Sequence, residues 1–239
     1  MRFCTRLVRP LVLCASVLAL LAAPRPVLAH HGKGFLLVES DEVPHPGQFF
    51  LFTDFALAHH EDEDEIELSP GLLFGATHRV AFEVHTHFHK HEGESLDYES
   101  VAPGLKVSLT DPESEEPLKL GLAAEYEITR GDEPDRFEAR VIAAYRTQEA
   151  NLTLNLIGEK SSEEGSDLEW GYAAGFRPWP ERQIGVGIEA AGTLSGESAH
   201  ELLAGVYFTG DRLTLKLGVG KGFGEGPEWT ARAGLVISF

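Results

Sequence analysis

The chain has 239 residues, and its 20 lysine and arginine side chains stand against 38 aspartate and glutamate side chains, for a net charge of −18 at pH 7. This acidity argues against nucleic acid as a partner, because phosphate contacts need a surplus of basic side chains. After residue 29 no stretch reaches the ~20 apolar residues of a membrane helix, so the sequence predicts no helical span in that part.

Residues 1–29 have the organisation of a secretory signal peptide. A front with three arginines precedes a mostly apolar stretch, residues 10–23, and Ala29 ends a run of small residues suited to cleavage. Cleavage there leaves 16 basic against 38 acidic residues, a net charge of −22. It also removes Cys4 and Cys14, the only two cysteines, so the exported chain has no disulfide or cysteine ligand. A lipoprotein is disfavoured, because Leu13 before Cys14 is too large for the lipid-attachment motif.

Residues 30–46 are polar and rich in histidine and proline. Within them, the apolar residues Phe35–Val38 predict either a short extra strand or a plug. The sequence otherwise favours a lead-in segment that precedes the main domain.

From Gly47 onward, apolar and polar residues alternate with a period of two, which is typical of strands with two different faces. Twelve strands are predicted, over residues 47–58, 66–77, 79–90, 98–110, 117–130, 135–147, 149–160, 167–178, 182–194, 200–209, 212–222 and 228–239. One set of connections is mostly short, such as 209–212, whereas the other is mostly longer and acidic, such as 59–65. An even strand number with alternating turns and loops indicates an antiparallel up-and-down barrel.

The last predicted strand has the most specific pattern. Every second residue from Trp229 to Phe239 is apolar, and both ends of this row are aromatic. A strand of this kind that ends in phenylalanine resembles those of bacterial outer-membrane β-barrel proteins. The resemblance implies an all-β transmembrane barrel in the outer membrane of a Gram-negative bacterium, reached by export through the inner membrane. It also implies that Phe239 closes the sheet and is recognised by the barrel assembly machinery. Residues 30–46 would then be a periplasmic N-terminal segment and residues 47–239 the barrel.

Alternation alone allows a second arrangement, because soluble lipocalin-like barrels have the same period with apolar side chains inside. Two features favour the membrane barrel. Glycines are frequent opposite the apolar rows, as a narrow lumen requires. The same face has charged residues, which we expect to line the lumen: Glu125, Glu127, Glu138, Arg140, Lys216 and Arg232. The apolar rows would face outer-membrane lipid and lipopolysaccharide.

Histidines gather on and around the strand predicted over residues 79–90. Strand parity directs alternate residues of this strand into the lumen, about 6.8 Å apart. The candidate metal ligands are Glu83, His85, His87, His89 and His91, with His59 and His60 from the neighbouring acidic loop. Imidazoles at this spacing can tilt toward one Zn²⁺ ion, and imidazole also suits copper and nickel. The alternative is a plain polar lumen in which histidine holds no ion.

The hairpin over residues 67–79 and the stretch 100–106 resemble outer-membrane transport proteins of the phenol-degradation meta-pathway type. This resemblance implies transport without naming a solute. The sequence therefore predicts a narrow channel or transporter for small solutes or ions. It does not predict an enzyme, because the serines near histidines have no base partner on the lipid face. Twelve strands lie between filled eight-stranded barrels and open sixteen-stranded porins, so the sequence leaves the width of the pore open. The alternative function is a metal-binding barrel with a histidine-lined lumen, for transition-metal capture or resistance.

Overall fold

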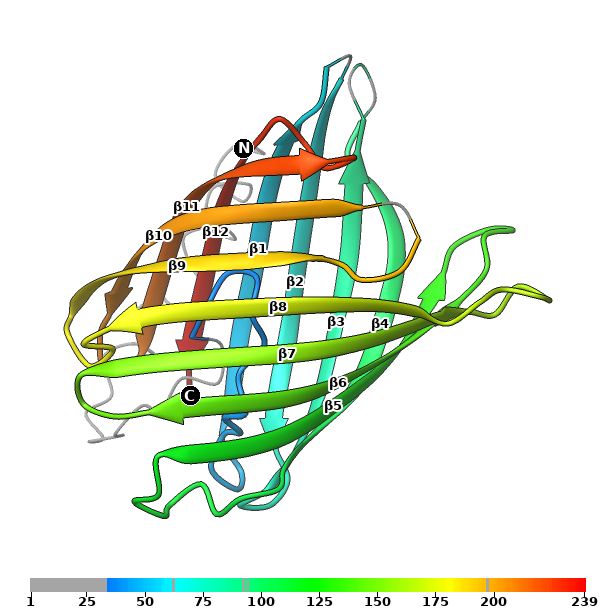
Figure 1. Cartoon of the computed structure of the whole chain (residues 1–239). Helices are drawn as coiled ribbons and strands as arrows, with labels where there is room; N and C mark the ends of the chain where they lie inside the picture. The colour runs from blue at the N-terminus through cyan, green and yellow to red at the C-terminus, as the bar shows by residue number, and fades with distance from the viewer. Residues whose placement is uncertain (1–33, 62, 92, 94, 197) are drawn as a thin grey trace, which may run out of the picture.

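The computed structural model describes residues 34–239 other than 62, 92, 94 and 197. The predicted signal peptide, residues 1–29, lies outside the described residues. In the described part of the chain, no helix is long and apolar enough to cross a membrane. The fold is all-β and consists of one antiparallel barrel (Figure 1).

The strands follow one another around the barrel in chain order, and β1 pairs with β12 to close it. They are β1 (Phe49–His59), β2 (Asp64–Gly75), β3 (Val80–Lys90), β4 (Asp97–Ser108), β5 (Leu118–Thr129), β6 (Arg136–Arg146), β7 (Ala150–Ser161), β8 (Glu169–Pro178), β9 (Ile184–Thr193), β10 (Ala199–Thr209), β11 (Leu213–Gly224) and β12 (Trp229–Ser238). All twelve predicted strands are confirmed, and each bound lies within two residues of its prediction.

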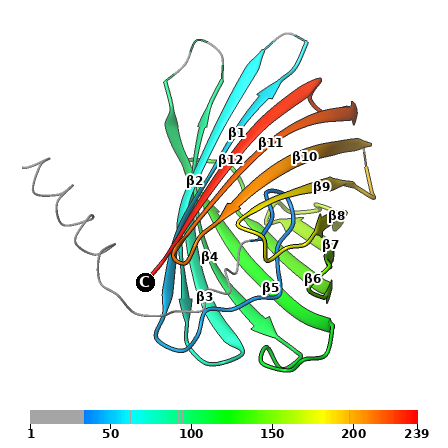
Figure 2. The ribbon, with the colours of Figure 1, turned by 90° about the vertical axis from the view of Figure 1, so that its left-hand side faces the viewer.

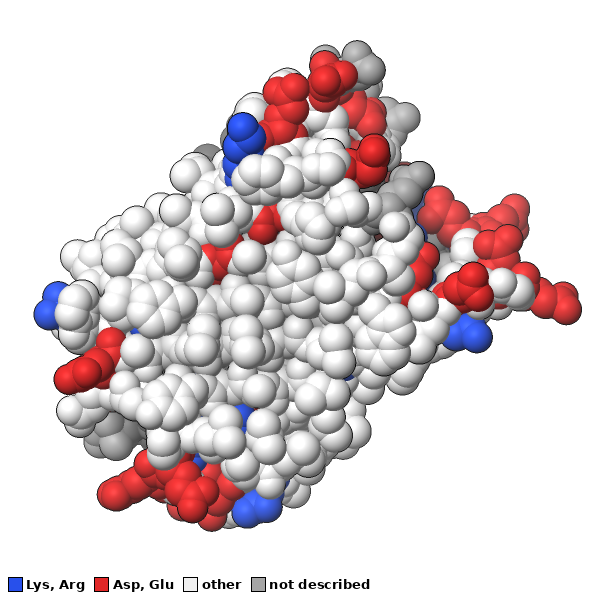
Figure 3. All heavy atoms as spheres, viewed as in Figure 1, with Lys and Arg blue, Asp and Glu red and all other residues white. Residues whose placement is uncertain are grey.

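The two faces of the wall differ as the alternation predicts. On β6, Phe137, Val141 and Tyr145 are about half exposed, whereas Ile142 and Ala144 are fully buried. Successive strand residues point to opposite faces, so the first three belong to the outer face and the last two to the inner face. In Figure 3 the middle of the wall is almost free of charged atoms, while acidic side chains gather toward the strand ends. The soluble arrangement, with apolar side chains inside, is therefore excluded.

The barrel closes where the first and last strands meet. The backbone N–H of Phe239 donates to the carbonyl of Phe49 at 3.0 Å, and the N–H of Phe49 donates to the carbonyl of Phe239 at 3.4 Å. Their rings stack with centroids 5.0 Å apart. From there, β1 and β12 stay in register from Phe50 opposite Ser238 to His59 opposite Trp229.

The described part of the predicted N-terminal segment lies inside the barrel (Figure 2). Phe35 and Val38 are 2% and 5% exposed and pack against Ala173 on the inner wall. Val43 packs in a second inner cluster with Phe50 and Leu73 near the start of β1. Of the two forms expected for Phe35–Val38, the structure shows a plug, since these residues are not part of any strand. The described part of this segment, which the sequence favoured as a periplasmic lead-in, thus fills one end of the lumen.

Two glycines make room for this segment on the inner wall. A Cβ atom at Gly175 would lie 2.6 Å from a ring carbon of Phe35. A Cβ atom at Gly218 would lie 2.7 Å from side-chain carbons of Leu36 and Leu203. The crowding expected of a narrow lumen is therefore caused here by the segment that enters it.

Replacing Gly175 by valine is expected to displace the segment from the wall. Overpacking typically costs about 1–3 kcal/mol. A Val38→Cys reporter, introduced into the chain from residue 30 onward, should then react with a water-soluble maleimide about tenfold faster or more. The matched control is Gly158→Val, because Gly158 points outward and a Cβ atom there would meet only ordinary contacts, the nearest at 3.5 Å from Trp170. Equal labelling rates in the two variants would contradict this account of the glycine.

Candidate functional site

The segment of residues 34–43, called the floor below, is held on one side by a single buried carboxylate. Glu189 on β9 accepts hydrogen bonds from the backbone N–H groups of Leu36 at 2.9 Å, Leu37 at 2.6 Å and Val38 at 3.3 Å. The hydroxyl of Tyr207 on β10 donates to the same carboxylate. Glu189 is 1% exposed, so these donors replace the water that a buried charge would otherwise lack.

Other strands hold the rest of the floor. Asn155 on β7 bonds both the N–H and the carbonyl of Glu39, at 2.8 and 2.9 Å. Lys216 on β11 donates to the carbonyl of Phe35 at 2.6 Å, and Arg177 on β8 donates to the carbonyl of Gly34 at 2.8 Å. Bonds from opposite parts of the wall fix the backbone, so the floor is an integral part of the barrel.

Ion pairs add to these backbone contacts. Lys106 on β4 pairs with Glu39. Arg146 on β6 pairs with Asp41 and, at 2.6 Å, with Glu42. Burial raises the pKa of the Asp41 carboxyl, and the guanidinium of Arg146 opposes that shift. These contacts place the floor near the strand ends that are joined by the short turns.

A cavity of about 260 Å³ lies inside the barrel against the floor. Its charged lining residues are six acids and four bases: Glu39, Asp54, Glu67, Glu83, Glu125 and Glu138 against Lys106, Arg140, Lys216 and Arg232. Ser69, His85 and His87 complete the polar lining. The lumen is therefore a charged cup with a small excess of carboxylates.

Each basic side chain of the cavity contacts a carboxylate. Arg140 binds Glu138 on its own strand, with its Nη2 at 3.0 Å, and Arg232 binds Glu201 at 2.8 and 3.1 Å. Lys216 lies 3.3 Å from Asp54, and Lys106 pairs with Glu39. The carboxylates that contact histidine instead are Glu67, Glu83 and Glu125. Three carboxylates beside histidines thus lie on the wall formed by β2, β3 and β5.

The six lumen charges predicted from the sequence all point inward. Glu125, Glu138, Arg140, Lys216 and Arg232 line the cavity. Glu127 accepts a hydrogen bond from Ser100 on the neighbouring β4. Arg140 pairs with Glu138, two residues away on the same strand.

The predicted metal ligands fall into separate groups. The Nδ1 atom of His85 lies 3.3 Å from Glu83, and its Nε2 atom lies 3.8 Å from Glu125. His87 lies 3.3 Å from Glu67, one step nearer the loops. The rings of His85 and His87 are 4.7 Å apart, but each ring already contacts a carboxylate.

The remaining predicted ligands lie farther toward the loops. The rings of His89 and His91 meet edge to face with centroids 4.4 Å apart, and His60 lies 3.5 Å from Glu65. His59 is apart from them, because its ring stacks on Trp229 at 5.3 Å and bonds Asp64 at 2.6 Å. Among the residues predicted to hold a metal, His59 is therefore separated from the others.

Sequence reasoning missed the residues that hold the floor, notably Glu189, Asn155 and Tyr207. Glu189 is the one acidic residue in β9, which is otherwise apolar or small. The alternation of β9 predicts that Glu189 points inward, but nothing in the sequence identifies the segment that Glu189 binds.

No protein-family model matches the sequence, and no curated protein matches it. Solved structures do match. An outer-membrane channel from Pseudomonas putida F1 superposes with a TM-score of 0.65 at 10% identity, covering 83% of this chain and 97% of that one. The fold is that of outer-membrane β-barrel channels.

Two porins have the same architecture. KdgM porin superposes with a TM-score of 0.59 at 7% identity, covering 80% of this chain and 99% of that one. NanC porin superposes with a TM-score of 0.56 at 7% identity, covering 79% of this chain and 98% of that one. At these identities the likeness concerns the barrel and not the residues that line it.

Proposed function

We propose that this protein is an outer-membrane channel for small solutes, closed at one end by the floor and selective for cations. The observation that supports it best is the charged cup inside a complete twelve-stranded wall. The Pseudomonas putida channel and the KdgM and NanC porins, to which the fold is similar, support transport rather than catalysis.

Sidedness is proposed from the connections. Short turns are periplasmic and longer loops extracellular in outer-membrane barrels. The floor, which lies at the turn end, would then separate the cavity from the periplasm. Lipid and lipopolysaccharide would surround the apolar band of the wall, in the outer membrane of a Gram-negative bacterium.

The charge of the lumen supports cations over acidic solutes. One of the similar structures is KdgM in complex with disordered oligogalacturonate, an acidic saccharide. In this chain the four cavity bases are engaged by carboxylates, while three further glutamates lie beside histidines. An acidic saccharide would therefore meet repulsion on the β2, β3 and β5 wall.

Cation selectivity is expected to depend on these glutamates. Because the floor closes the parent lumen, reversal potentials in a salt gradient are best measured in a Glu189→Ala/Asn155→Ala background. Glu67→Gln with Glu125→Gln should reduce the preference for K⁺ over Cl⁻. The preference should also weaken as salt rises, since charges are screened over about 8 Å at physiological ionic strength.

The matched control is Glu149→Gln with Glu181→Gln, which removes an equal charge from two exposed turns at the other end of the barrel. An anion preference in the background protein, or equal selectivity in the lumen and turn variants, would contradict the proposal. The alternative of a metal-binding barrel gains no support from the similar proteins, and it depends on the side chains alone.

A further inference from the structure

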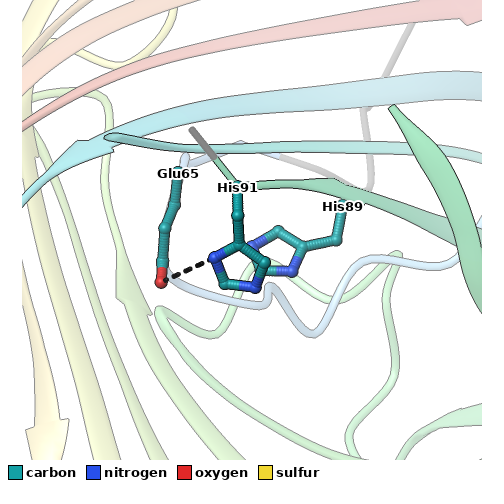
Figure 4. A group of neighbouring side chains, drawn as sticks. All are labelled: Glu65, His89 and His91. Carbon is teal, nitrogen blue, oxygen red and sulfur yellow. Dashed lines mark ion pairs between the residues drawn. The ribbon is translucent and has the colours of Figure 1, made fainter. Parts of the chain in front are cut away.

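Three side chains with metal-ligand chemistry meet at the loop end of the lumen. Glu65, His89 and His91 each offer one ligand atom, and these atoms all lie within 4.8 Å of one another. Figure 4 shows the carboxylate of Glu65 directed at the ring of His91, with the ring of His89 beside it. The cluster combines one residue near the start of β2 with His89 near the end of β3 and His91 just after it.

The register of the hairpin explains why they meet. Ile66 pairs with Lys90 and Glu67 with His89, so the next position brings Glu65 opposite His91. Glu67 lines the cavity, and residues two apart share a face. Glu65, His89 and His91 therefore belong to the inner face, at the loop end of the wall.

The distances suit a first-row transition metal after small side-chain rotations. The rings of His89 and His91 are 4.4 Å apart, and His91 Nδ1 lies 3.8 Å from Glu65. Ligands around a tetrahedral Zn²⁺ at ~2.0–2.1 Å lie roughly 3.3 Å from one another. The side chains of Glu65 and His91 are 31% and 45% exposed, so these rotations meet little resistance.

Further donors surround the cluster. Glu63 lies 3.6 Å from His91 Nδ1, and His60 Nε2 lies 3.5 Å from Glu65. Either one, or water, would complete four-coordination around two imidazoles and a carboxylate. This ligand set favours zinc, copper or nickel over the harder ions that prefer oxygen alone.

Histidine–carboxylate contacts continue inward from the cluster. His87 with Glu67 comes next, followed by His85 with Glu83 and Glu125 at the cavity. Each step is two residues along β3. A cation released from the outer cluster would therefore meet a further histidine and carboxylate at each step toward the cavity.

We propose that Glu65, His89 and His91 bind a divalent transition-metal ion at the loop end of the lumen. This inference goes beyond transport. It does not depend on an open pore, because metal ions reach the loop end of the lumen from solution and binding is measured at equilibrium. It also differs from a site centred on His85 and His87, which line the cavity rather than the loop end of the lumen.

Zn²⁺ titration of the refolded chain from residue 30 onward, in detergent near neutral pH with a competing colorimetric indicator, tests the proposal. One ion should bind per chain. His89→Ala/His91→Ala should weaken binding by more than the roughly 10–100-fold loss that changes around metal ligands typically cause. Glu65→Gln should weaken it less, because two imidazoles remain. Heat-dependent migration on gels verifies that each variant is a folded barrel.

Two control pairs make the test specific. His59→Ala/His78→Ala should bind like the parent, because His59 stacks on Trp229 and His78 lies in the turn between β2 and β3 at the opposite end. His85→Ala/His87→Ala should retain the tight site. Parent-like affinity in a folded His89→Ala/His91→Ala variant would overturn the proposal. So would loss of binding in His85→Ala/His87→Ala, or in His30→Ala/His31→Ala, since the site would then lie in the lumen or at the N-terminus.

Discussion

Replacing Glu189 and Asn155 together by alanine is expected to turn a mostly closed barrel into a conducting one. The double change removes the acceptor for three backbone N–H groups of the floor and both bonds to the backbone of Glu39. Hydrogen bonds to charged groups are worth about 1.5–3 kcal/mol each. A net loss of about 3 kcal/mol would raise the open fraction about a hundredfold, since each 1.4 kcal/mol is a factor of ten.

Single-channel recording in planar bilayers measures this change as longer or more frequent openings. The matched control is Glu127→Ala, because Glu127 is an inward carboxylate bonded to Ser100 on the wall. It should conduct like the parent. If the double variant migrates as a folded barrel and conducts no more than Glu127→Ala, the floor does not close the lumen.

Deleting Phe239 is expected to reduce the amount of folded barrel in the membrane severely while leaving export intact. The deletion removes both backbone bonds to Phe49 and the ring stacked on it. These contacts hold β1 and β12 together at one end of the β1–β12 seam, along which the two strands pair. If the two strands separate there, each exposes an unpaired edge. Heat-modifiable protein in outer-membrane fractions measures the folded amount.

Two substitutions separate the ring from the backbone. Phe239→Ala keeps the backbone pair and should give an intermediate yield. Phe208→Ala removes an aromatic side chain from the outer face of β10, away from the seam, and should assemble normally. A yield from the deletion equal to that of Phe208→Ala would show that the seam closes without its last residue.

The wall was predictable because its information is local. Period-two alternation defines each strand and its faces, so Glu125 and Arg140 were correctly placed in the lumen. The alternation of short and long connections then defines the order of the strands. The ion pairs within the wall are harder to predict, because a flexible side chain such as that of Arg140 reaches Glu138 on its own strand.

The floor was not predictable to the same depth. Phe35–Val38 indicated a strand or a plug, but the bonds from Glu189 join residues more than 150 positions apart. Nothing local in the sequence distinguishes Glu189 from any other inward acid. Its function appears only when the backbone of Leu36 and Leu37 is placed beside it.

The histidines show what residue alternation predicts and what depends on the pairing of strands. His85 and His87 line the cavity, as parity predicts, whereas Glu65 was missed because its nearness to His91 depends on hairpin register. His59 was grouped with the ligands on sequence proximity alone. It shares the parity of Phe55, a residue of the outer face, and stacks on Trp229 accordingly.

The way the floor is anchored also sets an order of events during assembly. The segment that forms it is the first described part of the chain, yet its carbonyl at Phe35 is bound by Lys216, 181 positions later. Its other partners are spread over β4, β6, β7, β8 and β9. Contacts of such long range form late, because the intervening chain must first be ordered. The β1–β12 seam joins residues equally far apart, so closure of the barrel and docking of its own N-terminal segment are both expected among the last steps of maturation.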